Sequence, residues 1–119
     1  MIDISEGIEL FNKADFFSAH DFFEECWMES DGEERLFFQG MVQVSVGCYH
    51  LISGNFRGSL SQLKKGTKKL RSYLPSHRNI DLENLINIIE PIIQELNDFI
   101  SEQDPQMFWN KIPKIKLND

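Results

Sequence analysis

The sequence predicts an all-α protein, a single-domain bundle of about five helices that spans residues 1–119. Apolar residues recur at helical spacing in five segments, and turn signals separate these segments. No stretch shows the strict alternation of apolar and polar residues that marks a half-buried strand. The composition is 41% hydrophobic and 26% charged, which is typical of a globular chain with a packed core.

The first two helices are expected to be short and to follow each other closely. The first covers about residues 5–13, with Ser5 or Asp3 as its cap. The second runs from residue 15 or 16 to residue 29, where the turn signal SDG at 30–32 ends it.

The third helix is expected over about residues 33–52 and ends at the turn signal SGN at 53–55. It is apolar on nearly all sides, which predicts a place at the centre of the fold. Gly40 and Gly47 share one side of this helix. Because glycine weakens a helix, the pair predicts a packing role, and we expect it to admit a neighbouring helix.

The fourth helix is expected to begin with Asn55 as its cap and to stop before Pro75. One side carries apolar residues at helical spacing. The other faces carry basic side chains. We interpret them as the solvated face of an amphipathic helix rather than as a binding site for a phosphate or an acidic partner. This basic face consists of Lys64, Lys65, Lys68, Lys69 and Arg71.

A fifth helix and a tail are expected over residues 81–119. The helix covers about residues 81–101, and Pro91 inside it is expected to produce a kink. After Pro105 the helical pattern fades, so the tail is predicted to dock on the bundle as a short turn followed by an extended arm.

Charge is distributed in three blocks. Residues 1–34 hold eleven acidic side chains against Lys13 alone, residues 35–78 hold eight basic side chains and no acidic one, and residues 79–119 hold eight acidic against three basic. The blocks favour helices that pair faces of opposite charge, within one chain or across a homodimer. The net charge of −7 disfavours a nucleic-acid partner.

The cysteines and the hydropathy indicate the compartment. Cys26 and Cys48 lie in apolar helical patterns without CxxC spacing and without a secretory leader, so we expect reduced core thiols in a cytoplasmic protein. The apolar stretch of residues 36–52 is interrupted by polar side chains and is shorter than the roughly 20 residues of a membrane span. No membrane association is therefore expected.

The stretch AHDFFEECW at residues 19–27 sets titratable groups among aromatic ones. On a helical wheel, His20 lies in the middle of the apolar arc and Glu24 about 40° from it, while Glu25 lies beyond the edge. His20 and Glu24 are therefore predicted to point inward, and Glu25 to point outward or to sit at a rim. Trp27 lies on the packed arc and is expected in the core.

The third helix carries one polar stripe that could meet these groups. Helices joined by a short turn usually pack as antiparallel neighbours, so the stripe is expected to face the second helix and to supply partners for Glu24. Together they form a predicted polar site between the second and third helices. The stripe consists of Arg35, Gln39, Gln43 and His50.

Two longer motifs, FFSAHDFFEECW and QGMVQVSVGCYHLISGNFRGSLSQLKKGTKKL, resemble the small bacterial and archaeal family called domain of unknown function 309. The resemblance covers about residues 9–74. Asp21 and Ser59 depart mildly from the family pattern, which has glutamate and alanine there. The positions that fit the pattern are His20, Glu24, Trp27, Gln39, Gly40, Gln43, His50, Gly54, Asn55 and Gly58. The resemblance implies an α-helical bundle and a general prediction of metal-dependent hydrolase activity.

One hypothesis is accordingly a metal-assisted hydrolase. His20 and Glu24 at i and i+4 can reach one ion from a single helix, and His50 could add a second imidazole ligand. Glu25 or Asp21 would be the general base for a metal-bound water. The ion would be divalent, Zn²⁺ or Mn²⁺, and the absence of any cofactor is an equally open alternative.

A second hypothesis is a non-enzymatic helical module, for interaction or structure, that forms a dimer. The polar residues of the second and third helices would then be a buried hydrogen-bonded network, with a charge pair between Arg35 and Glu24. A third hypothesis is a pocket for a small ligand or anion, with Trp27 and Tyr49 as apolar walls.

His77, beside Pro75, is expected to be a solvated loop residue.

Overall fold

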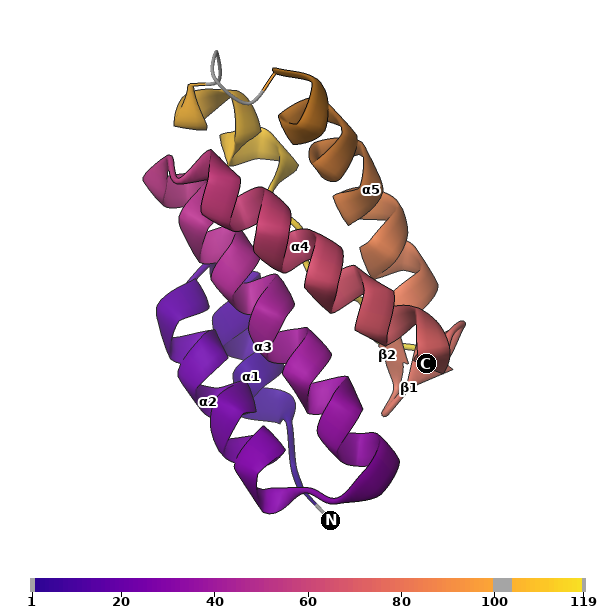
Figure 1. The fold of residues 1–119 in the computed structure, drawn as a ribbon. Helices are drawn as coiled ribbons and strands as arrows, with labels where there is room; N and C mark the ends of the chain where they lie inside the picture. The colour runs from indigo at the N-terminus through magenta and orange to yellow at the C-terminus, as the bar shows by residue number, and fades with distance from the viewer. Residues whose placement is uncertain (1, 100–103, 119) are drawn as a thin grey trace.

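Five α-helices and two 3₁₀ helices account for most of residues 2–99 and 104–118, which are the residues described by this computed structural model (Figure 1). The predicted all-α class is confirmed, and the predicted end of the fifth helix at residue 101 lies outside the described residues. The helices are α1 (Ser5–Asn12), α2 (Phe16–Glu29), α3 (Gly32–Ser53), α4 (Phe56–Leu70), η1 (Arg71–Tyr73), α5 (Leu82–Phe99) and η2 (Pro105–Lys111).

Local hydrogen bonds explain where the first helices begin and end. The Asp15 carboxylate accepts a bond of 3.3 Å from the Ser18 backbone N–H and caps α2. The predicted cap Asn55 is confirmed, because its Oδ1 accepts from the Gly58 N–H at 3.0 Å. Gly54 ends α3 with φ of 85°, a conformation that glycine adopts without steric cost.

Close contact between α3 and α4 sets the centre of the fold. A Cβ on Gly40 would lie 3.0 Å from the Leu70 side chain, and a Cβ on Gly47 would lie 2.7 Å from Leu63. The predicted packing role of the two α3 glycines is therefore confirmed, and the neighbour is α4. α4 contributes Gly66, where a Cβ would lie 2.9 Å from the Val44 backbone nitrogen. Backbone meets backbone at this crossing.

α3 lies between two neighbours, with α2 packed along one side and α4 along the other (Figure 1). α1 packs on α2, α5 packs on α4, and η2 packs against α3. The core of this arrangement is largely aromatic, and the phenylalanines that are almost completely buried are Phe11, Phe16, Phe23, Phe37, Phe38 and Phe108. One side of the α2, α3 and α4 layer has no further element packed on it within the described residues.

A small hairpin, which the sequence did not predict, joins η1 to α5. Its strands are β1 (Ser76–His77) and β2 (Ile80–Asp81), paired antiparallel. Arg78 and Asn79 form the turn with φ of 49° and 67°, which fits the type I′ geometry of two-residue hairpins.

The C-terminal segment after η2 runs as an extended arm along the hairpin, as predicted. A bridge joins Leu117 to Ile80, and the Asp81 N–H donates to the Lys116 carbonyl at 2.8 Å. Asn12 at the end of α1 bonds both backbone groups of Ile115, at 3.0 and 2.7 Å. The arm therefore connects the hairpin to the first helix.

Both cysteines are buried free thiols, as expected for core positions. Burial raises the pKa of the Cys26 thiol to about 11 and also raises the pKa of Cys48. No helix within residues 2–99 and 104–118 combines the length and hydropathy that crossing a membrane requires.

Substitution of Gly66 by alanine is expected to destabilise the fold. The added methyl group would press on the Val44 backbone and the Gly40 carbonyl, which cannot rotate away. Such overpacking costs about 1–3 kcal/mol, more than the roughly 0.5–1 kcal/mol that alanine gains over glycine in a helix. Urea unfolding of Gly66→Ala measures the loss. Ser61→Ala, at an exposed position of the same helix, is the control and should lose nothing. An unchanged midpoint for Gly66→Ala would contradict the close crossing.

Candidate functional site

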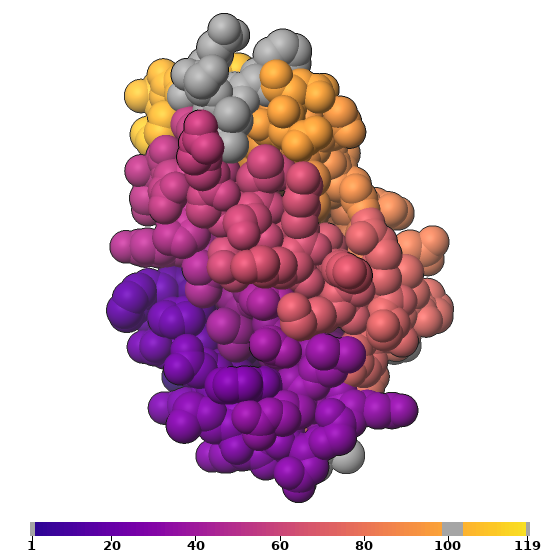
Figure 2. Space-filling view, viewed as in Figure 1, coloured from indigo at the N-terminus to yellow at the C-terminus, as the bar shows by residue number. Residues whose placement is uncertain are grey.

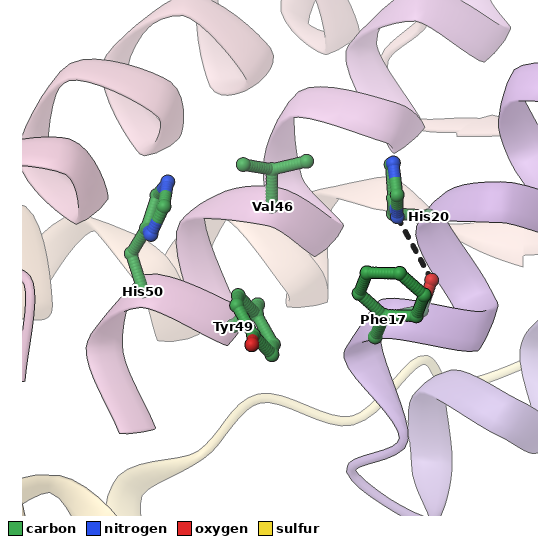
Figure 3. Close-up of a pocket in the computed structure, with 5 residues that line it drawn as sticks. All are labelled: Phe17, His20, Val46, Tyr49 and His50. Carbon is green, nitrogen blue, oxygen red and sulfur yellow. Dashed lines mark hydrogen bonds between the residues drawn. The ribbon is translucent and has the colours of Figure 1, made fainter. Parts of the chain in front are cut away.

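A cavity of about 200 Å³ lies in the groove between α2 and α3 (Figure 3). α2 contributes Phe17 and His20, and α3 contributes Val46, Tyr49 and His50. The Phe17 and Tyr49 rings lie 6.0 Å apart between centroids. Most of the surface around this cavity is apolar, and the residues with polar side-chain atoms that line it are His20, Tyr49 and His50.

The His20 ring is held by its own helix. Its Nδ1 donates to the Phe17 carbonyl at 2.8 Å, while its Nε2 lies 3.5 Å from Glu24 Oε2. Asp21 Oδ1 lies 3.7 Å from the ring. The side chain of His20 is 22% exposed and that of Glu24 is 47% exposed. The prediction that Glu24 points into the interior is therefore wrong, because its carboxylate lies at the rim of the groove in contact with water.

His50 is positioned by the start of α4. Asn55 Nδ2 lies 3.4 Å from His50 Nδ1, and a Cβ on Gly58 would lie 2.9 Å from the ring. Figure 3 shows His20 and His50 at opposite ends of the cavity, with Tyr49 and Val46 between them.

These residues do not fit the metal centre implied by the family resemblance. Within residues 2–99 and 104–118, no three side chains of histidine, cysteine, aspartate or glutamate are grouped closely enough to hold an ion. The set predicted as ligands, His20, Glu24 and His50, is thus not brought together, because the two imidazoles are separated along the groove. No chemical step through a metal follows from this arrangement.

A second cavity of about 240 Å³ continues the groove and is lined by Glu24, Trp27, Gln39, Val42 and Gln43. The two glutamines of the predicted stripe therefore line the same cavity as Glu24. Gln43 also accepts a hydrogen bond of 2.8 Å from Lys69 of α4. Trp27 is half-buried at this cavity rather than in the core.

The predicted charge pair between Arg35 and Glu24 is wrong. The Arg35 guanidinium instead lies 4.5 Å from the centroid of the Trp27 ring, as a cation–π contact, and the side chain is exposed. Glu24 is solvated and Gln43 is bonded to α4, so the polar residues of α2 and α3 do not form the buried hydrogen-bonded network that was predicted. They line an open groove.

Glu25, suggested as a general base, is exposed, which fits its predicted outward position. It lines a different groove, together with Glu6 and Leu10 of α1. Asp21, the other suggested base, contributes to that groove as well and touches the His20 ring. Neither carboxylate lines the cavity between the two imidazoles.

A polar cluster that sequence reasoning missed lies at the other end of α3. Glu34 accepts a hydrogen bond of 2.5 Å from His77 Nε2 and another of 2.6 Å from Arg78 Nε. Arg78 also donates to the Ile2 carbonyl at 2.7 Å. The His77 ring lies 4.6 Å from Phe37 between centroids. The expectation of a solvated His77 is therefore wrong, because the hairpin folds it back onto α3.

Electrostatics favours the charged form of Glu34. Burial by itself raises the pKa of this carboxyl, but the bonds from His77 and Arg78 outweigh burial and hold the pKa below its ordinary value of 4.5. The cluster also holds Arg78 at a positive φ that arginine rarely adopts. It joins the N-terminal segment, α3 and the hairpin.

The fold and the groove define an all-α bundle with an open groove, part aromatic and part polar, between two neighbouring helices. Residues 4–62 match the family described as Domain of unknown function (DUF309), so the chain belongs to that family through its first half. The resemblance expected from the motifs is confirmed. The matched segment includes α2 and α3, which line both cavities. A comparison with curated proteins found no match.

Addition of Zn²⁺ or Mn²⁺ is expected to leave the thermal midpoint of the purified protein unchanged. His20 and His50 lie at opposite ends of their cavity, and no third ligand joins them among the described residues, which therefore offer no stable site for an ion that requires three or four ligands. Thermal shift and elemental analysis check this, with His20→Ala as the comparison. A stoichiometric ion that stabilises the wild type but not His20→Ala would contradict it.

Replacement of Glu34 by glutamine is expected to destabilise the protein near neutral pH. The free energy of unfolding should fall by about 1 kcal/mol. The loss is no larger because roughly a third of the Glu34 side chain is in water, which weakens its ion pairs. The pKa of Glu34 is lowered by folding, so its contribution is complete above pH 4.5 and is lost as the pH falls through the folded value. Urea unfolding of both proteins near neutral and acidic pH measures this.

The stability difference between wild type and Glu34→Gln should therefore shrink on acidification. Glu25→Gln, which removes an exposed carboxylate outside the cluster, is the matched control. A difference for Glu34→Gln that stays constant from neutral to acidic pH would show that the ion pairs are not its cause.

Proposed function

We propose that this protein is a non-enzymatic helical module that self-associates through one side of its α2, α3 and α4 layer. We call this side the outer face. It carries Phe17 and Glu24 of α2, Val46 and Tyr49 of α3, and Lys65 and Lys69 of α4.

The observation that carries the proposal is the exposure of large aromatic side chains on this face. Six phenylalanines are almost completely buried, yet Phe17 is 55% exposed and Tyr49 is 41% exposed, side by side at the same cavity. Burial of such a side chain contributes about 1.5–3 kcal/mol. Contiguous apolar surface rimmed by polar groups is typical of protein interaction sites.

The shape of the molecule supports the same proposal. α2, α3 and α4 lie side by side, with α3 between the other two (Figure 1), and side chains of these helices cover much of the lower and central surface in the same view (Figure 2). Val42 and Val46 of α3 are only half-buried there, although α1 packs on α2, α5 packs on α4 and η2 packs against α3. A second molecule would cover the side that the chain itself leaves open.

A hydrolytic function has less support from the same residues. Among the described residues, the predicted metal ligands His20, Glu24 and His50 are not grouped, and the suggested general base Glu25 lines a different groove from His50. Among the described carboxylates, those of Asp21 and Glu24 are near His20, and both are exposed or half-exposed. The groove residues fit a contact surface better than they fit a water-excluding reaction site.

Sedimentation equilibrium over a concentration series tests the proposal. The wild type is expected to approach twice the 13.9 kDa mass of one chain as its concentration rises. Val46→Asp should stay monomeric, because two facing copies would bury carboxylates at the middle of the outer face. Leu117→Asp, at an exposed apolar position of the C-terminal arm, should associate like the wild type. A wild type that stays monomeric throughout would overturn the proposal.

A further inference from the structure

We infer that two copies pair about a two-fold axis parallel to α3, so that the acidic α2 edge of each copy faces the basic α4 edge of the other. This inference rests on the proposed self-association and specifies its partner as a second copy in one orientation.

The two edges of the outer face carry opposite charge. On the α2 edge, Glu24 has no cationic partner other than the His20 ring among the described residues. On the α4 edge, Lys65 and Lys69 form no ion pair with any described carboxylate within 4 Å. Burial and the charges of Lys65 and Lys68 lower the pKa of Lys69. Apart from the His20 ring, each edge therefore lacks a counter-charge among the residues that the structure describes.

The opposite charges lie at the same level along α3. Glu24 lines a cavity with Gln43, and Lys69 donates a hydrogen bond to Gln43 from the other side. Rotation by 180° about an axis parallel to α3 keeps each residue at the same level along α3. It places the α2 edge of one copy opposite the α4 edge of the other. Glu24 of one copy then meets Lys69 of the other, and the contact occurs twice in the dimer.

The alternative face-to-face arrangement has the axis perpendicular to α3 and in the plane of the interface. It would place α2 on α2 and α4 on α4, so that Glu24 and Lys69 would each approach like charges. Like charges in contact across an interface oppose association. The charge pattern therefore selects the parallel arrangement.

The spacing of outward residues on α3 suits the packing of one α3 helix on another. Gln39, Val42, Val46 and Tyr49 follow one another at intervals of three, four and three, the spacing of a coiled-coil seam. In a parallel pair each of these residues meets its own counterpart. Val46 would then pack on Val46, and the two Gln39 amides could bond each other, which fixes the register of paired helices.

The size of the outer face is sufficient for a stable dimer. Three helices about 10 Å apart and roughly 20–30 Å long present an area on the order of 600–900 Å². A standard protein interface takes about 800 Å² from each partner. The outer face therefore has the area that a specific pair of copies requires.

Charge reversal tests the orientation. Glu24→Lys alone should place lysine against Lys69 of a like copy, and Lys69→Glu alone should place glutamate against Glu24. Each variant should dimerise at least ten-fold more weakly than the wild type. A mixture of the two should recover association, because every contact across the mixed dimer joins opposite charges. Sedimentation, with one variant isotopically labelled for native mass spectrometry, measures homodimers and mixed dimers separately.

Glu25→Lys makes the same charge change outside the outer face, and it should dimerise like the wild type. If Glu24→Lys instead pairs preferentially with the wild type, α2 meets α2 and the inferred orientation is wrong, while the proposed self-association stands. Weak association of both variants with no recovery on mixing would also overturn the orientation. A wild type that never dimerises would overturn the proposed function itself. Circular dichroism confirms that each variant is folded.

Discussion

The crossing of α3 and α4 is the constraint on which the rest of the structure depends. Gly40 and Gly47 of α3 and Gly66 of α4 bring the two backbones together at distances that a side chain would prevent. Because α4 occupies this side of α3, α2 packs along the other side, and the two neighbours leave the outward side of α3 uncovered. The contact from Lys69 to Gln43 and the position of His50 beside Gly58 both follow from the same crossing.

The features that could be predicted from the sequence depend on interactions between residues that are close together in the chain. Helical periodicity depends on near neighbours, and a cap such as Asn55 bonds an N–H only three residues away, so the helices could be placed from the sequence. The glycines of α3 also predicted a close neighbour. The identity of that neighbour could not be predicted, because nothing in α3 distinguishes α4 from the other helices as the element that supplies the matching Gly66.

The candidate site was harder to predict, because a helical wheel gives directions but not which directions are covered. His20 and Glu24 do lie toward the α2 and α3 groove, but the groove stays open and Glu24 remains in contact with water. The Glu34 cluster escaped prediction for a different reason. Its partners His77 and Arg78 lie more than 40 residues away, in a hairpin too short to give a periodic signal.

The contact between Asn12 and Ile115 has a consequence for the order in which the chain can complete its fold. The two residues are 103 positions apart, and this contact secures the C-terminal arm to α1. During synthesis α1 emerges well before the segment that holds Ile115, the partner of Asn12. Contacts of such sequence separation form late, since the intervening chain must first be ordered. α1 is thus completed by a segment that is synthesised 103 positions after Asn12, and the bundle reaches its final form only once that segment has emerged.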